Sequence, residues 1–145
     1  MFRKRRTGLR TEEPPLIPVA IGELVDKITI LEIKAERITD ATKLLSVRYE
    51  LGLLRAVWEK RRVADPALDA LIAALKNTNE MLWTVEADLR ERERRQDFGP
   101  RFIELARAAY RNNDRRSALK RKIDVLSGSA IKEEKSYDDT ADQSR

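Results

Sequence analysis

The sequence contains no cysteine and no histidine. Disulfides, thiolate nucleophiles and thiolate zinc sites are therefore excluded, together with any mechanism that depends on an imidazole. No stretch reaches the roughly 18 apolar residues of a membrane span, and no apolar run follows the basic start, as a secretory signal would require. We therefore expect a cytoplasmic protein, and no spacing of carboxylates predicts a metal site or a cofactor.

Glycine and proline are scarce, with five of each among 145 residues, whereas charged side chains make up 38%. This balance is typical of long, solvated, amphipathic helices. The net charge of +5 arises entirely in the first ten residues, whose basic side chains are Arg3, Lys4, Arg5, Arg6 and Arg10. The rest of the chain is neutral, with 25 basic and 25 acidic side chains.

A neutral body argues against nucleic-acid binding by the folded part of the chain. The short basic arm has two interpretations. It is either a solvated, disordered terminus, or a weak attachment point for anionic lipid, RNA or an acidic partner.

Residues 11–19 (TEEPPLIPV) cannot be helical, because their three prolines fix an extended backbone. We expect the apolar residues of this segment to lie along the helices as a strap: Leu16, Ile17 and Val19. Four segments with apolar residues at alternating three- and four-residue spacing follow, which predicts four helices.

Local signals mark the ends of these helices. The first helix covers 21–38, and Asp40 is a candidate N-cap for the second, which should end near Arg62. Asp65 and Pro66 mark the start of the third helix. A turn at 97–100 (DFGP) separates it from the fourth, which Gly128 ends.

The predicted fold is all-α, an antiparallel four-helix bundle with coiled-coil-like packing and a disordered tail at each end. A basic, proline-containing arm and strap occupies 1–19, the helical bundle 20–128 and a flexible tail 129–145. The tail contains too few apolar residues to pack.

Polar residues interrupt the predicted seams. Thr78 lies in the third seam, and the fourth contains both an asparagine and an arginine. Folding the helices back on one another gathers a set of polar side chains at a similar level: Glu32, Arg48, Tyr49, Asn79, Asn112 and Arg116. A polar layer inside a bundle costs roughly 1–3 kcal/mol for each unsatisfied group. These residues therefore need partners.

One interpretation of this layer is a structural network. In it, Arg116 pairs with Glu32 or Asp114 and fixes the register of the helices, while Asp26 faces Arg55. Replacing Arg116 by methionine should then be tolerated, because methionine is apolar and of similar length.

The other interpretation is a binding pocket for a small anion. Arg116 and Arg48 would contact the charge, because the guanidinium fork matches a carboxylate or phosphate. The orienting groups would be Asn79, Asn112 and Tyr49. Catalysis there would depend on a carboxylate, a lysine or a tyrosine for proton transfer, or on electrostatic stabilisation alone.

Three stretches of the chain resemble a family of short bacterial proteins. They are IGELVDKITILEIKAERI (21–38), FIELARAAYRNNDRRSALKRKID (102–124) and the later EEKSYDD. The family is an uncharacterised, all-helical domain of unknown function. The resemblance implies a bacterial, all-helical protein with an accessory role in envelope glycan metabolism, and it supplies no catalytic residues.

The function that we expect from the sequence is a non-enzymatic interaction module that binds a protein partner or a second copy of itself. The first alternative is a small-anion binding protein or enzyme with a polar pocket inside the bundle. The second alternative is weak binding of nucleic acid or an anionic membrane through the basic arm.

Overall fold

A computed structural model of the chain describes residues 13–136, which form four α-helices and no strand. The helices are α1 (Ile21–Arg37), α2 (Ala41–Glu59), α3 (Pro66–Arg94) and α4 (Pro100–Leu126). This confirms the predicted all-α class and the four predicted helices. The basic side chains predicted to form an attachment arm lie outside the described residues: Arg3, Lys4, Arg5, Arg6 and Arg10.

The helix ends follow the local signals in the sequence. Asp40 caps α2 by accepting a hydrogen bond from the amide of Lys43 at 2.8 Å, and Asp65 caps α3 through the amide of Ala67, also at 2.8 Å. Gly128 follows α4 with φ +66°, the left-handed conformation that glycine adopts most readily. The N-cap position of α1 is Ala20, which offers no side-chain acceptor.

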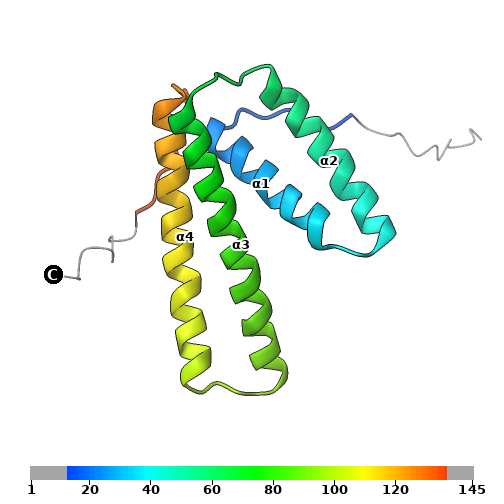
Figure 1. Cartoon of the computed structure of the whole chain (residues 1–145), viewed down its shortest axis with the longest axis vertical. Helices are drawn as coiled ribbons and strands as arrows, with labels where there is room; N and C mark the ends of the chain where they lie inside the picture. Colours follow the sequence, from blue (N-terminus) through cyan, green and yellow to red (C-terminus); the bar gives the residue numbers. More distant parts are fainter. Residues whose placement is uncertain (1–12, 137–145) are drawn as a thin grey trace, which may run out of the picture.

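The four helices form two hairpins, α1–α2 and α3–α4, and α1 lies between α2 and the α3–α4 hairpin (Figure 1). The long α3–α4 hairpin extends well beyond the C-terminal end of α1. Helix α1 packs against all three other helices, whereas α2 packs along α1 alone. No helix of the described part is long and apolar enough to cross a bilayer.

Helix α1 contributes to two apolar clusters. One joins it to α3 and α4 and contains Val25, Leu68, Leu75, Leu119 and Ile123. The other joins it to α2 and contains Leu24, Ile28, Leu31 and Leu51. The half-buried Trp58 packs against both clusters. Burial on two sides explains why α1 has more buried residues than any of the other three helices.

Helix α2 does not fold onto α3 as the bundle geometry predicted. It diverges from the long hairpin and meets α3 only near its own C-terminal end, where Arg62 lies 3.7 Å from Asp69. Residues 62–65 between the two helices form no regular secondary structure, and the backbone of Asp65, the last of them, is extended.

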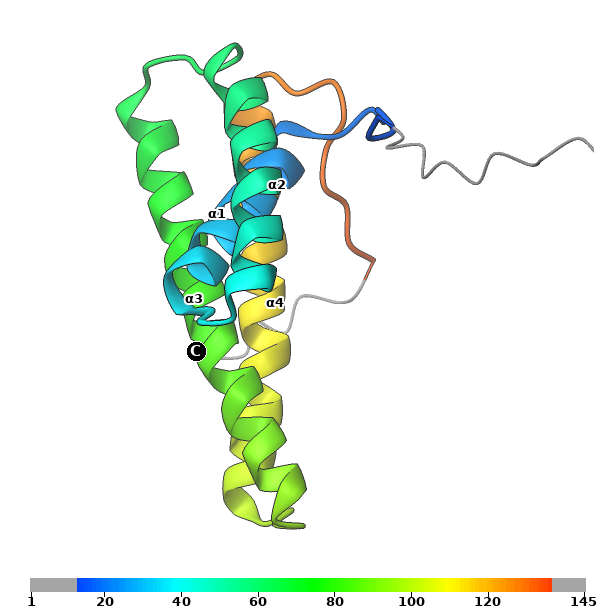
Figure 2. The same ribbon diagram turned by 90° about the vertical axis from the view of Figure 1, so that its right-hand side faces the viewer.

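The segment before α1 also differs from the prediction. Residues 13–20 are non-helical, as their prolines require. Leu16, Ile17 and Val19 do not pack as a strap, however, since Leu16 is 97% and Ile17 74% exposed. The segment leaves α1 on the side of the molecule where α2 lies (Figures 1 and 2).

Candidate functional site

The first turn of α1 is capped by α4 and the segment that follows it. Asp124, which is 0% exposed, accepts a hydrogen bond from the amide of Gly22 at 2.6 Å. Ser129 accepts another from the amide of Ile21 at 3.1 Å. These distant acceptors replace the missing side-chain cap and place a negative charge at the positive end of the helix dipole.

The other carboxylate oxygen of Asp124 accepts the amide of Glu133 at 2.8 Å. Residues 129–136, the described part of the predicted flexible tail, are thereby held against α4. Further pairs join Arg121 to Glu134 and Lys135 to Asp114. These ionic contacts hold the segment in place although it contains few apolar residues.

Lys120 is a buried cation between two carboxylates on the same side of the molecule. Its ammonium lies 2.5 Å from Glu23 of α1 and 3.1 Å from Glu133. Burial lowers the pKa of Lys120, but the hydrogen bonds to Glu23 and Glu133 and the negative charges nearby outweigh burial and raise it overall. The lysine therefore stays charged and joins α1, α4 and the C-terminal segment.

Asp26 forms the second buried centre. It is 1% exposed and receives two hydrogen bonds from Arg116, at 2.9 Å from Nε and 2.6 Å from Nη2. Asn79 donates to Asp26 at 2.9 Å and to the hydroxyl of Thr29 at 3.0 Å. The hydrogen bonds and the charge of Asp26 raise the pKa of Arg116. The pair is therefore a bidentate, ionised bridge between α1 and α4.

The structure brings together only part of the predicted polar layer. Asn79 and Arg116 meet on Asp26, as their seam positions indicated. Arg48 and Tyr49 are exposed on α2 and lie away from this centre. Asn112 instead donates to the carbonyl of Ala108 in its own helix at 2.9 Å.

The predicted partners of Arg116 were wrong. Arg116 pairs with Asp26, while Glu32 pairs with Arg55 at 2.8 Å and with Lys76 at 3.4 Å. Asp114 pairs with Lys135. The physical reason is that Asp26 lies on the side of α1 that faces the long hairpin, whereas Glu32 faces α2 and the flank of α3.

Several central residues were not among the predicted site residues: Gly22, Glu23, Asp26, Thr29, Lys120, Asp124 and Glu133. The sequence does contain a signal for those on α1. Gly22, Asp26, Thr29 and Ile33 repeat at alternating four- and three-residue spacing, and all four are buried. This second seam is adjacent to the apolar one and contains the polar residues that face α3 and α4.

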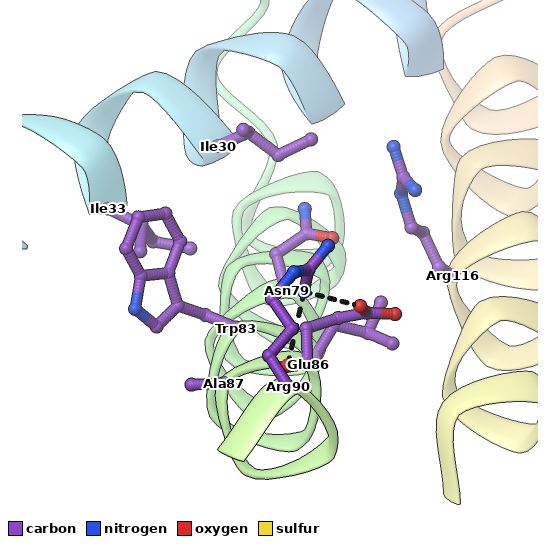
Figure 3. A pocket seen from close by; sticks show the side chains of 9 residues that line it. Ile30, Ile33, Asn79, Trp83, Glu86, Ala87, Arg90 and Arg116 are labelled. Atoms are coloured by element: carbon purple, nitrogen blue, oxygen red, sulfur yellow. Dashed lines mark hydrogen bonds and ion pairs between the residues drawn. The ribbon is translucent and has the colours of Figure 1, made fainter. Parts of the chain in front are cut away.

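Two cavities border Arg116. The larger, of about 600 Å³, lies between α1, α3 and α4, with Ile30, Ile33 and Trp83 among its apolar walls (Figure 3). In it Arg90 is paired with Glu86 at 2.7 Å. The smaller, of about 290 Å³, is polar and lined by Asn113, Arg116, Ser117, Lys120, Glu133 and Lys135.

Each cation of the smaller cavity already has a carboxylate partner. Arg116 has Asp26, Lys120 has both Glu23 and Glu133, and Lys135 has Asp114. Throughout residues 13–136, no buried side-chain nitrogen or oxygen lacks a hydrogen-bond partner. An anion would therefore have to displace carboxylates, which favours a structural role for this network.

Lys120 makes the stability of the fold sensitive to alkaline pH. Its pKa in the folded chain is raised above the ordinary lysine value of 10.5. Its contribution is therefore fully present below pH 10.5 and is lost as the pH rises through the raised folded value. We expect wild type to be more stable than Lys120→Met at about pH 9, and the difference to shrink above pH 10.5.

Urea unfolding of both proteins across this range measures the effect. Tyrosines and the other lysines titrate in both proteins and cancel in the difference. A difference that stays constant with pH would show that Lys120 is not held by its carboxylates in solution.

Comparisons with known proteins add no activity to this description. No protein-family model, curated protein or solved structure matches the chain. This outcome agrees with the resemblance to an uncharacterised helical family and leaves the function to be argued from the chain itself.

Proposed function

We propose that the chain is a non-enzymatic interaction module, in which α1, α3 and α4 form a rigid scaffold and α2 presents a docking face. One observation carries the proposal. Over residues 41–57, the side of α2 that points away from α1 is exposed and free of charged side chains, and its large side chains are mainly apolar.

Four large side chains run along this outward face at one-turn spacing. Leu45 is 70%, Tyr49 66%, Leu53 42% and Val57 45% exposed. The residues around them are small or uncharged and are also exposed: Ala41, Thr42, Ser46, Gly52 and Ala56. We call this set of nine residues the outward face of α2.

Such a face is unusual in a chain in which 38% of the residues are charged. The opposite side of α2 is apolar as well and packs on α1 through Leu44, Val47, Leu51, Leu54 and Trp58. A helix that is apolar on both sides is typical of burial on both sides. Exposed apolar patches of this kind mark interaction surfaces.

The buried network also supports a module without catalytic activity. Two ion pairs join α4 to α1: Arg116 pairs with Asp26, and Lys120 pairs with Glu23. These pairs hold α1 in a fixed position on the scaffold. A bacterial origin, a cytoplasmic location and an accessory role in envelope glycan metabolism remain predictions that fit such a module.

Site-specific photo-crosslinking in cells tests the proposal. A benzophenone side chain placed at Tyr49 should form adducts, because the docking face is covered in the working complex. The matched control places it at Glu104, an exposed position on α4. Adding Leu45→Glu and Leu53→Glu should abolish the adducts at position 49. Equal yields at the two positions would contradict a docking role for α2.

A further inference from the structure

The charges around the outward face of α2 are mainly positive. Residues 41–62 contain six basic side chains and two acidic ones. Glu50 is already bound to Lys27 at 2.6 Å. Among the described residues, the basic side chains of this region without an ion pair are Lys43, Arg48, Lys60 and Arg61.

This arrangement argues against a second copy as the occupant. Pairing two identical outward faces would bring their basic borders together, with Glu59 as the one unpaired acid on each side. Like charges facing each other in an interface are unfavourable. The partner that covers the outward face of α2 should therefore offer apolar groups to the large side chains of this face and negative charges to its basic border.

The position of α2 leaves its outward face open to an extended surface. Helix α2 lies at the edge of the molecule, packs along α1 and meets α3 only near its own C-terminal end (Figures 1 and 2). An apolar helix face bordered by lysine and arginine, with a tyrosine among its apolar residues, is the composition of helices that lie in a bilayer interface. Tyrosine suits this position because its ring is apolar and its hydroxyl stays hydrated.

A second apolar element lies on the same side. Leu16 and Ile17 are among the most exposed apolar residues of the chain, and their segment and α2 both lie on the side that Figure 2 presents to the viewer. The basic residues at 3–10 precede them in the sequence.

Building on the proposed docking role of α2, we infer that this face binds the surface of an anionic bilayer. Leu45, Tyr49, Leu53 and Val57 enter the headgroup and upper acyl region, while Arg48 and Lys60 contact lipid phosphates. Attachment is peripheral and combines apolar burial with charge attraction, each of which alone binds weakly.

Cosedimentation of the full chain with lipid vesicles tests this inference. Wild type should bind vesicles of phosphatidylglycerol and phosphatidylcholine at least about tenfold more strongly than vesicles of phosphatidylcholine alone. Raising the salt from about 0.1 M to about 1 M should weaken binding, because the Debye length falls to roughly 3 Å. Leu45→Glu with Leu53→Glu should reduce binding by about tenfold or more.

Ile103→Glu is the matched control, because Ile103 is also an exposed apolar residue but lies on α4. It should bind as wild type does. Both leucines are exposed, and circular dichroism checks that the double variant is folded. Arg48→Glu supplies an independent variant that reverses one charge and leaves the apolar stripe unchanged, and it should also weaken binding to anionic vesicles.

Some results would overturn the inference. One is a Leu45→Glu, Leu53→Glu variant that binds anionic vesicles as strongly as wild type. The same holds if vesicle binding is lost only when residues 1–12 are deleted. Another is equal binding to neutral and anionic vesicles. If the chain does not bind vesicles but position 49 crosslinks to a protein, the lipid assignment is wrong and the proposed interaction module is retained. Loss of both signals would remove the proposed function as well.

Discussion

Replacing Arg116 by methionine should destabilise the fold by about 3–5 kcal/mol, the typical cost of leaving a buried charge without its partner. Asp26 is almost completely buried and receives two hydrogen bonds from Arg116. In the variant, Asn79 would be its remaining side-chain donor. This result is the opposite of the sequence-based prediction, in which methionine is tolerated because it is apolar and of similar length.

A double-mutant cycle separates the ion pair from the packing around it. Asp26→Leu combined with Arg116→Met replaces both charges with apolar side chains and should recover most of the lost stability, because no charge is left buried and unpaired. Urea unfolding of the four proteins measures the coupling. If Arg116→Met melts at or above the wild-type temperature, Asp26 and Arg116 are not paired as the structure places them.

The ends of the helices could be predicted from the sequence because their signals are local. Asp40 caps an amide three residues away and Asp65 one two residues away. Neither interaction depends on the rest of the fold. The same holds for Gly128, whose left-handed backbone lies just beyond α4.

The partners across helices could not be predicted in the same way. Pairing positions by folding the chain back assumes straight, closely packed hairpins, and α2 instead diverges from α3. Which carboxylate of α1 meets Arg116 depends on the rotation of that helix about its axis. Asp26 and Glu32 are six residues apart and therefore lie on different sides of α1. The polar breaks in the apolar seams of the third and fourth helices identified Asn79 and Arg116, but not Asp26, to which both are hydrogen-bonded.

The exposed apolar face of α2 was not predicted from the sequence for a related reason. The sequence shows two apolar stripes on this helix, and only the structure decides which of them α1 covers. Tyr49 was assigned to a pocket in the bundle, whereas it lies in the middle of the exposed stripe. The structure thus changes the role proposed for Tyr49 from a ligand contact to a surface anchor.

Two glycine substitutions should shift stability in opposite directions. Gly22→Ala places a methyl group 2.6 Å from the carbonyl oxygen of Lys120 and 2.8 Å from Asp124. Real Cβ atoms do not approach a backbone oxygen so closely, so α1 and α4 must separate and the cap on α1 weakens. We expect a loss of about 3 kcal/mol, from overpacking and from the strained hydrogen bond to Asp124.

Gly52→Ala is the matched control, because Gly52 also lies inside a helix but nothing lies within 4 Å of the added methyl group. Alanine there should stabilise the chain by about 0.5–1 kcal/mol through its higher helix propensity. Thermal unfolding of both variants beside wild type is the measurement. Two variants that melt alike would mean that α1 does not approach α4 closely at Gly22, and the buried positions of Asp124 and Lys120, which depend on that approach, would be wrong with it.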